Sequence, residues 1–316
     1  MKKVLFATTA LVLTAGVAAA EVTVGGDGRM GVIYDGSDWN FTSRIRIKFT
    51  ASGETDGGLQ FGGSARVDHY DTTAASTGSA TNGAAGEVYI SGAFGKLSMG
   101  DVDVAPQAAL GDVSGVGLTG LGDYNEIAYV SGNEDPHALY SYAMGDFGLF
   151  LSANSQGDYG IGANYTFGNF MVGAGYEYVD SGTSQAGSSW GSSGKMHFSD
   201  TWGNAASQWI IGADASFGDV TGKVRFARYD EDGFDGIMDQ LSLSVDYTMG
   251  ATTVTGYYAN FRGGDGYSGL DADFYGVGAS YDLGGGASLK GGVVRVDDPG
   301  IAVEETRGDF GVSFTF

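Results

Sequence analysis

The chain contains no cysteine, which excludes a disulfide framework, a thiolate nucleophile and a thiolate-bound metal. Lysine and arginine are also scarce: there are 16 of them against 38 aspartates and glutamates, a formal charge of −22. A chain this acidic repels nucleic acid and attracts cations, so we expect no nucleic-acid partner. After residue 20, no apolar run approaches the roughly 20 residues that a membrane-spanning helix needs.

The first twenty residues have the composition of a secretory signal peptide. Lys2 and Lys3 precede an apolar stretch that ends in small residues at Ala20, where cleavage is expected. A membrane anchor is the alternative, but the apolar stretch is short for one. We therefore expect a signal peptide at 1–20 and a single exported domain at 21–316.

Beyond the signal peptide, apolar and polar residues alternate with a period of two, which is typical of β-strands. In 41–50 one face is apolar at four of its five positions, and the other carries only Thr42, Arg44, Arg46, Lys48 and Thr50. The alternation recurs in 161–167, 241–249, 275–283 and 310–316. Glycine, at 57 of 316 residues, disfavours helix, and no sustained helical stripe is present.

The alternation and the turn signals predict sixteen antiparallel strands. Their expected ranges are 22–34, 40–51, 59–70, 86–94, 97–101, 137–144, 147–154, 158–167, 170–179, 207–217, 220–229, 239–249, 252–261, 272–283, 287–296 and 305–316. Short turns that start with glycine are expected at 95–96, 145–146, 168–169, 218–219, 250–251 and 284–286. They alternate with mostly longer connections at 71–85, 102–136, 180–206, 230–238, 262–271 and 297–304, which is the pattern of outer-membrane barrels.

A soluble β-sandwich would also alternate, so the period alone does not distinguish it from a membrane barrel. Three further features favour the barrel. The strands have about the 10 residues that a tilted bilayer crossing requires. Aromatic residues such as Trp39, Phe49 and Phe167 gather near strand ends, as in interfacial girdles. Ionic residues such as Arg225 and Asp246 lie in mid-strand on the polar face, where a water-filled lumen would solvate them.

Several segments resemble one family. These are GDGRMGVIYDGSDWNFTSRIRIKFTASGETDGGLQF at 26–61, SGAFGKLSMGD at 91–101, YTFGNFMVGAGYE at 165–177 and YGVGASYDLGGGAS at 275–288. They are similar to the general-diffusion porins of purple non-sulfur and related alphaproteobacteria. The resemblance implies an all-β, 16-stranded transmembrane barrel of the cell outer membrane, with short periplasmic turns, long extracellular loops and an inward-folded third loop.

The same resemblance implies partners. It predicts a homotrimer, surrounded by outer-membrane lipid and lipopolysaccharide. The terminal aromatic Phe316 matches the family's assembly signal, which implies contact with the assembly machinery.

The segment 102–136 is the longest connection, and its 35 residues are expected to have no regular structure; long connections of this kind are usually functional. It contains no lysine or arginine, and its acids, with Asp101 at its base, are Asp103, Asp112, Asp123, Glu126, Glu134 and Asp135. The resemblance implies that it folds inward and narrows the pore; an external, solvated loop is the alternative. The stretch around Asp112 is similar to the family's aromatic-Gly-Asp-Leu sequence, although Leu110 replaces the aromatic residue.

Basic residues fall on the polar faces of the first three strands and the last. They are Arg29, Arg44, Arg46, Lys48, Arg66 and Arg307. Closure would place the last strand beside the first, so all six would share one wall. An acidic loop opposite this wall would create a transverse field at the constriction, and the overall charge predicts a weakly cation-selective channel. Simple pairing of these cations with Asp27 and Asp68 is the alternative.

No cofactor is expected to be required. Calcium at Asp101 and Asp103, or at acidic stretches such as 230–235, is a lesser hypothesis, and solvated loop charge is its alternative. The glycine motifs of the GxGxxG type occur about as often as chance predicts in so glycine-rich a chain. His69, His137 and His197 are scattered singly, so neither a metal cluster nor an enzyme is expected.

The lead function is a passive channel for small hydrophilic solutes and ions. One alternative is a substrate-selective channel, which would need aromatic residues along the lumen; the alternation places few there. Another is an adhesin or structural barrel with a plugged lumen.

Overall fold

The computed structural model describes residues 21–71, 84–130, 137–180, 189–190, 196–197, 205–232, 238–263, 271–298 and 303–316. The expected signal peptide at 1–20 lies outside the described residues. Within them, no helix is long and apolar enough to cross a bilayer.

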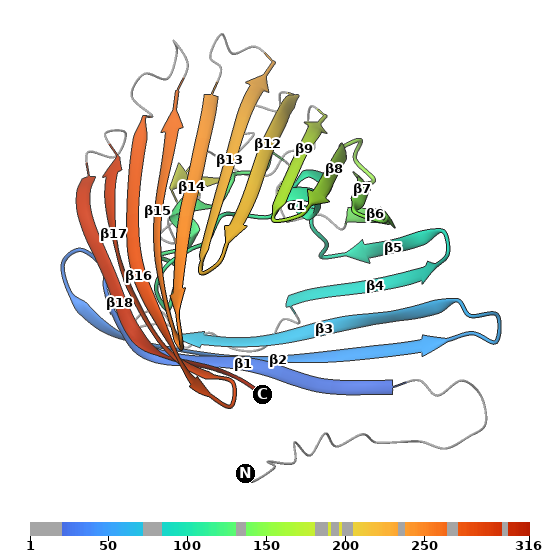
Figure 1. Ribbon diagram of the computed structural model, residues 1–316. Coiled ribbons are helices and arrows are strands. Elements are labelled where there is room, and N and C mark those ends of the chain that lie inside the picture. Colours follow the sequence, from blue (N-terminus) through green and yellow to red (C-terminus); the bar gives the residue numbers. More distant parts are fainter. Residues whose placement is uncertain are drawn as a thin grey trace.

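Sixteen antiparallel strands form one closed barrel (Figure 1). In chain order they are β1 (Glu21–Tyr34), β2 (Trp39–Glu54), β3 (Gln60–Asp71), β4 (Ala84–Gly92), β5 (Gly95–Gly100), β6 (His137–Met144), β7 (Phe147–Ala153), β8 (Tyr159–Phe167), β9 (Phe170–Val179), β12 (Ala206–Phe217), β13 (Val220–Glu231), β14 (Met238–Met249), β15 (Thr252–Arg262), β16 (Ala272–Gly284), β17 (Ala287–Asp298) and β18 (Val303–Thr315). A separate two-stranded sheet, β10 (Ser189–Trp190) with β11 (Met196–His197), lies within the connection between β9 and β12.

The barrel closes where β18 pairs with β1, from Asp27 opposite Thr315 to Tyr34 opposite Gly308. Phe316 extends this pairing, because its N–H donates to the carbonyl of Gly26 at 3.0 Å and its carbonyl accepts from the Gly26 N–H at 2.8 Å. Closure gives every strand of the barrel a neighbour on both sides, which suits a barrel in lipid.

The glycine-led turns are confirmed at four hairpins. Gly145, Gly168, Gly218 and Gly250 have φ between 57° and 62°, the left-handed conformation that two-residue hairpin turns require. The expected turn at Gly95-Lys96 is wrong by two residues. The chain reverses at 93–94, and Gly95, with φ of 103°, is the first residue of β5.

The two faces of each strand meet different surroundings. On β2, Phe41 is 86 % exposed on the outer surface, whereas the neighbouring Thr42 is 4 % exposed on the inner surface. The outer surface carries exposed aliphatic and aromatic side chains on nearly every strand, including Ile161, Val245 and Val277. This apolar outer surface suits contact with lipid, and Arg44, Arg46 and Lys48 of β2 and Arg66 and Asp68 of β3 point inward.

Candidate functional site

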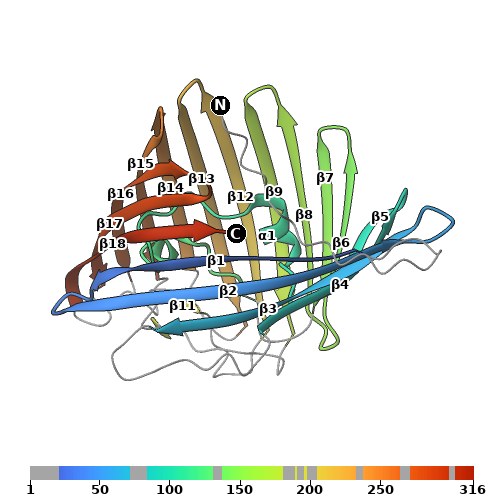
Figure 2. The ribbon, with the colours of Figure 1, turned by 90° about the horizontal axis from the view of Figure 1, so that it is seen from below.

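The connection between β5 and β6 runs inside the barrel. Its described part, 101–130, contains a short helix α1 (Ala105–Leu110) and a single 3₁₀ turn η1 (Asp123–Asn125). The expectation of no regular structure here is therefore wrong for these two stretches. Pro106 helps to start α1, because its fixed φ suits the first helical turn. Figure 2 shows the segment within the ring of strands, with α1 beside β8 and β9.

The helix α1 packs against glycines of the barrel wall. The Ala105 N–H donates to the hydroxyl of Ser152 on β7 at 2.9 Å, and Asn164 on β8 donates to the Ala109 carbonyl at 2.7 Å. A Cβ atom at Gly162 would lie 2.4 Å from the Ala105 carbonyl oxygen, so only glycine permits this approach. Comparable close approaches occur under α1 at Gly173, Gly175 and Gly212, and under residues 116–118 of the segment at Gly278, Gly292, Gly311 and Gly31.

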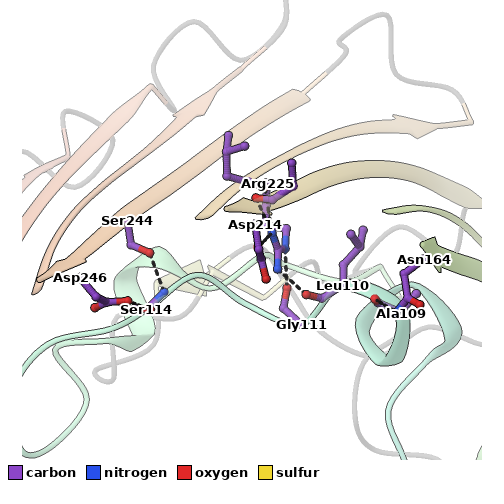
Figure 3. Close-up of polar contacts among 11 residues, drawn as sticks. Ala109, Leu110, Gly111, Ser114, Asn164, Asp214, Arg225, Ser244 and Asp246 are labelled. Atoms are coloured by element: carbon purple, nitrogen blue, oxygen red, sulfur yellow. Dashed lines mark hydrogen bonds and ion pairs between the residues drawn. The ribbon is translucent and has the colours of Figure 1, made fainter. Parts of the chain in front are cut away.

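Arg225 of β13 fixes the end of α1 (Figure 3). Its side chain is 1 % exposed and donates to the carbonyls of Leu110 and Gly111, the latter at 2.9 Å. It also pairs with Asp214 of β12 at 2.6 Å. A guanidinium placed at the last carbonyls of a helix satisfies acceptors that the helix leaves free.

Neutral side chains hold the C-terminal end of the described segment, residues 126–130. Gln240 of β14 accepts from the Ala128 N–H at 2.9 Å and donates to the Glu126 carbonyl at 2.6 Å. Gln208 of β12 accepts from the Val130 N–H at 3.2 Å and donates to the Ala128 carbonyl at 3.0 Å. Each of these two buried side-chain amides thus donates one hydrogen bond to the backbone of the segment and accepts one from it.

Two further contacts secure the segment along the wall. Ser114 donates from its N–H to Ser244 at 2.9 Å and from its hydroxyl to Asp246 at 2.6 Å (Figure 3). At the far side, Asp309 of β18 accepts from the N–H groups of Leu118, at 2.9 Å, and Thr119, at 2.6 Å.

Arg29 of β1 completes this attachment by donating to the Leu118 carbonyl at 3.0 Å. The segment is therefore attached to the wall from β7 round to β1, across the closure of the barrel. The structure places the described part of the segment inside the barrel, so the alternative of an external, solvated loop does not apply to that part.

An apolar core fills the space between this segment and the wall. The segment contributes side chains that include Leu121, Tyr124 and Ile127. The wall contributes buried side chains from six strands: Val179, Ile210, Ala227, Tyr229, Tyr257, Ala259, Phe261, Ala272, Phe274, Val294 and Val296.

The expectation of few inward aromatics is thus wrong. The sequence carried a signal, since residues 257–261 and 293–296 have apolar side chains at positions of both faces. A strand that is buried on both faces loses its alternation.

The predicted acidic residues that lie in the described part of the segment do not form one cluster. Asp112 accepts from the Ile127 N–H at 3.0 Å and thereby braces the segment internally. Asp123 lies in η1. Asp101 and Asp103 stand at the start of the segment near Glu87 of β4. The Asp103 carboxyl keeps an exposed surface, yet desolvation by the surrounding protein raises its pKa, and repulsion from Asp101 and Glu87 adds to this. Glu134 and Asp135 lie outside the described residues.

The six predicted cations share one wall, but the segment covers only some of them. Besides Arg29, Arg307 is covered: it pairs with Glu305 and lies 5.7 Å from the centre of the Tyr124 ring. Burial of that ring raises the pKa of Tyr124 to about 12. The remaining four, Arg44, Arg46, Lys48 and Arg66, stand on β2 and β3 away from the segment's described contacts.

Pairing with nearby acids, the alternative for these cations, is realised in part. Arg44 pairs with Asp27 at 3.0 Å, and Asp68 is shared between Arg46 at 3.3 Å and Arg66 at 2.7 Å. Lys48 forms no ion pair within the described part of the chain. The basic wall therefore combines internal ion pairs with an excess of positive charge.

A closed barrel of sixteen strands, apolar outside, charged inside and narrowed by an internal segment, is the architecture of a membrane channel. The family model of Gram-negative porins matches residues 7–300. The chain belongs to the Gram-negative porin family. It is 38 % identical to a porin of Rhodobacter capsulatus, over 94 % of this chain and all of that protein. A porin of Fuscovulum blasticum is 29 % identical, over 94 % of this chain and all of its own length.

Solved structures agree. A refined porin structure, 35 % identical, superposes with a TM-score of 0.74 over 94 % of this chain and the whole of that chain. A variant of Rhodopseudomonas blastica porin, 24 % identical, superposes with a TM-score of 0.65 and supports the fold alone. This porin is thus a multi-pass β-barrel of the outer membrane that serves general diffusion, and its family points to a channel.

Metal binding stays a prediction. Within the described ranges, no group of three or more histidines, cysteines, aspartates or glutamates is arranged to hold a metal ion. Calcium at Asp101 and Asp103 would have to rely on fewer side-chain ligands there, or on backbone oxygens and water.

Proposed function

We propose that this porin conducts small hydrophilic solutes and ions with a weak preference for cations, and that its constriction lies between the internal segment 101–130 and the basic wall. The basic wall is Arg29, Arg44, Arg46, Lys48, Arg66 and Arg307. The observation that carries the proposal is the anchoring of an acidic segment without lysine or arginine inside the barrel.

The charge balance supports the cation preference. The segment carries Asp101, Asp103, Asp112, Asp123 and Glu126. The six wall cations stand among four carboxylates, at Asp27, Asp68, Glu305 and Asp309, so the positive excess of the wall is smaller than the negative charge of the segment. Charged residues that line a narrow pore set the preference for the opposite ion.

The inward aromatics do not favour a substrate-selective channel. Tyr229, Phe261 and Phe274 are almost fully buried beneath the segment. They therefore stabilise its position and present no aromatic track to a passing solute.

We further propose that residues 1–20 are removed on export and that the mature chain forms a homotrimer among outer-membrane lipid and lipopolysaccharide. Phe316, hydrogen-bonded to β1, would serve as the signal for the assembly machinery. Closed cyclic symmetry is the usual arrangement of oligomers of one chain. Light scattering in detergent tests this; the mass of a single mature chain would contradict it.

The reversal potential in a planar bilayer tests the selectivity. Under a KCl gradient, we expect a small potential of the sign that denotes K⁺ preference, and a lower preference in the variant Asp123→Asn. Asp146→Asn, in the tight turn after β6, is the control and should leave the potential unchanged. A clear preference for chloride in the unmodified porin would refute the proposed selectivity.

A further inference from the structure

A hollow of about 460 Å³ lies at the end of the basic wall nearest the start of β1 and the end of β18. Three cations line it, Arg46, Lys48 and Arg66, together with the threonines Thr23, Thr50 and Thr315. Its position follows from the register: Lys48 stands directly opposite Arg66 on β3 and opposite Gly25 on β1. Because Gly25 has no side chain, the space beside the Lys48 side chain stays open.

Little negative charge is available to neutralise this hollow. Among the described residues that line it, Asp27 has the only side-chain carboxylate, and it already pairs with Arg44 at 3.0 Å. The main-chain carboxyl of Phe316 lies beside Gly26 and offsets one positive charge of the three lining cations. Arg46 and Arg66 share the single carboxylate of Asp68. The exposed Lys48 side chain has no ion-pair partner anywhere in the described part of the chain. A net positive site thus persists inside a strongly acidic protein.

The donors of this hollow suit one class of ligand. Guanidinium groups present paired N–H donors that match the oxygens of phosphate and carboxylate, and an ammonium group adds a compact charge. Threonine hydroxyls can donate to further oxygens of the same ligand. A cation or an uncharged apolar solute would gain nothing from this set.

We propose that the hollow at Lys48 is a binding station for small oxyanions, such as phosphate and phosphorylated or carboxylated solutes. The inference rests on the proposed function, because a solute must enter the lumen to reach the hollow. Such a site binds anions locally, in a pore whose overall negative charge repels them. Anions and cations then follow different walls: anions pass along β2 and β3, and cations pass along the acidic segment.

Conductance with phosphate as the probe tests this. The full mature porin is inserted in a planar bilayer in KCl, and the current is followed as inorganic phosphate is added. We expect the current to fall with phosphate and then to saturate. Lys48→Gln should raise the half-saturating concentration about two- to fivefold, the effect of losing one exposed charge contact.

Lys290→Gln is the matched control. Lys290 also lies on the inner face, on β17 opposite Ser280 and Gly311, and has no neighbouring arginine across either pairing. It changes the lumen charge by the same amount but should leave the half-saturating concentration unchanged. An equal shift in both variants would overturn the proposal, since only overall lumen charge would then matter.

Phosphorus NMR separates this inference from the proposed function. Line broadening of phosphate by the detergent-solubilised porin should be reduced in Lys48→Gln and unchanged in Lys290→Gln. A porin that conducts KCl without a saturable phosphate effect and without broadening would overturn the binding station alone. A porin that conducts no ions would overturn the proposed function, while the broadening would still report on the hollow.

Discussion

The inner surface of this porin has two unlike halves. From β7 round to β18 the wall is covered by the segment 101–130, and there Ile210, Phe274 and Val294 are fully buried. Over β2 and β3 the wall is bare and carries charged side chains such as Arg46, Lys48 and Arg66. A polar inner face is thus a property of exposure to water: where protein replaces water, the same face becomes apolar.

The polar groups of the two halves differ as well. In the covered half most are neutral, such as Gln208, Gln240 and Ser244, and each is hydrogen-bonded to the segment. In the bare half they are mostly ionic. Burying an amide costs little once it is hydrogen-bonded, whereas burying a charge requires a partner in good geometry. The buried charges of the covered half have such partners: Arg225 pairs with Asp214 and donates to two carbonyls, and Asp309 accepts from the N–H groups of Leu118 and Thr119.

The strongest test of the covered half is the substitution Arg225→Met. It removes a buried charge and leaves Asp214 and the carbonyls of Leu110 and Gly111 without their donor. We expect the segment to lose about 3 to 5 kcal/mol of docking free energy, the usual cost of breaking a buried ion pair. Hydrogen exchange at the amides of 105–119 measures this loss directly.

Arg228→Met is the matched control, since Arg228 is 42 % exposed on the outer face and lies 3.7 Å from Asp239. It should change exchange by about 0.5 kcal/mol or less. Unchanged exchange in Arg225→Met would show that the segment stays docked without this residue, and the contrast between the halves would then lose its strongest support.

A smaller loss of stability is expected from substitution of the wall glycines that contact α1. Gly162→Ala introduces a Cβ atom 2.4 Å from the Ala105 carbonyl and 2.7 Å from the Ala109 Cβ, so α1 must shift. We expect about 1 to 3 kcal/mol of destabilisation and a changed single-channel conductance. Gly256→Ala is the control, because its Cβ atom meets nothing closer than 3.9 Å. If both variants have the same conductance and melting temperature, the close contact between α1 and Gly162 is not required to hold α1 in place.

The smallest effect concerns ionisation on the bare side. Because the pKa of Asp103 is raised, this carboxyl gains its proton at a higher pH than an ordinary aspartate. As pH falls, cation preference should therefore begin to decline at a higher pH than an ordinary aspartate would give. The folded protein disfavours the charged form of the Asp103 carboxyl. The contribution of this carboxyl to the free energy of unfolding therefore falls as pH rises through its raised pKa.

Reversal potentials between neutral and mildly acidic pH measure this decline. At neutral pH, Asp103→Asn should have a lower cation preference than the unmodified porin. As pH falls, it should lack the early decline that protonation of Asp103 causes. The same pH profile in both proteins would mean that Asp103 does not contribute to the field in the pore.

The strands were largely predictable because their signal is local. Side chains alternate between the faces of any strand, so hydrophobicity in 41–50 or 241–249 reveals its face without reference to a partner. Tight turns were predictable where glycine occupies a left-handed position, as at Gly145 and Gly218. The turn near Gly95 was misplaced because a positive φ fits both a turn and the strand residue that follows it.

The site was predictable only in part. Alternation placed the six basic residues on the inner face of neighbouring strands, and the register confirms that placement. It could not tell that Arg29 and Arg307 are covered while Lys48 is exposed. The inward course of the acidic segment came from a family resemblance, and the residues that anchor it, above all Arg225 and Asp309, were missed.

The sequence by itself determined the period of the strands, the positions of most hairpins and the face on which each charge lies. All of these depend on residues close together in the chain. Only the tertiary structure decided which part of the inner face is dry and which is open to solutes. That division depends on contacts such as Leu118 with Asp309, which are separated by 191 residues, and on wall glycines whose purpose appears only when α1 lies against them. Local periodicity cannot encode such pairings, because each side chain has the same face whether water or protein covers it.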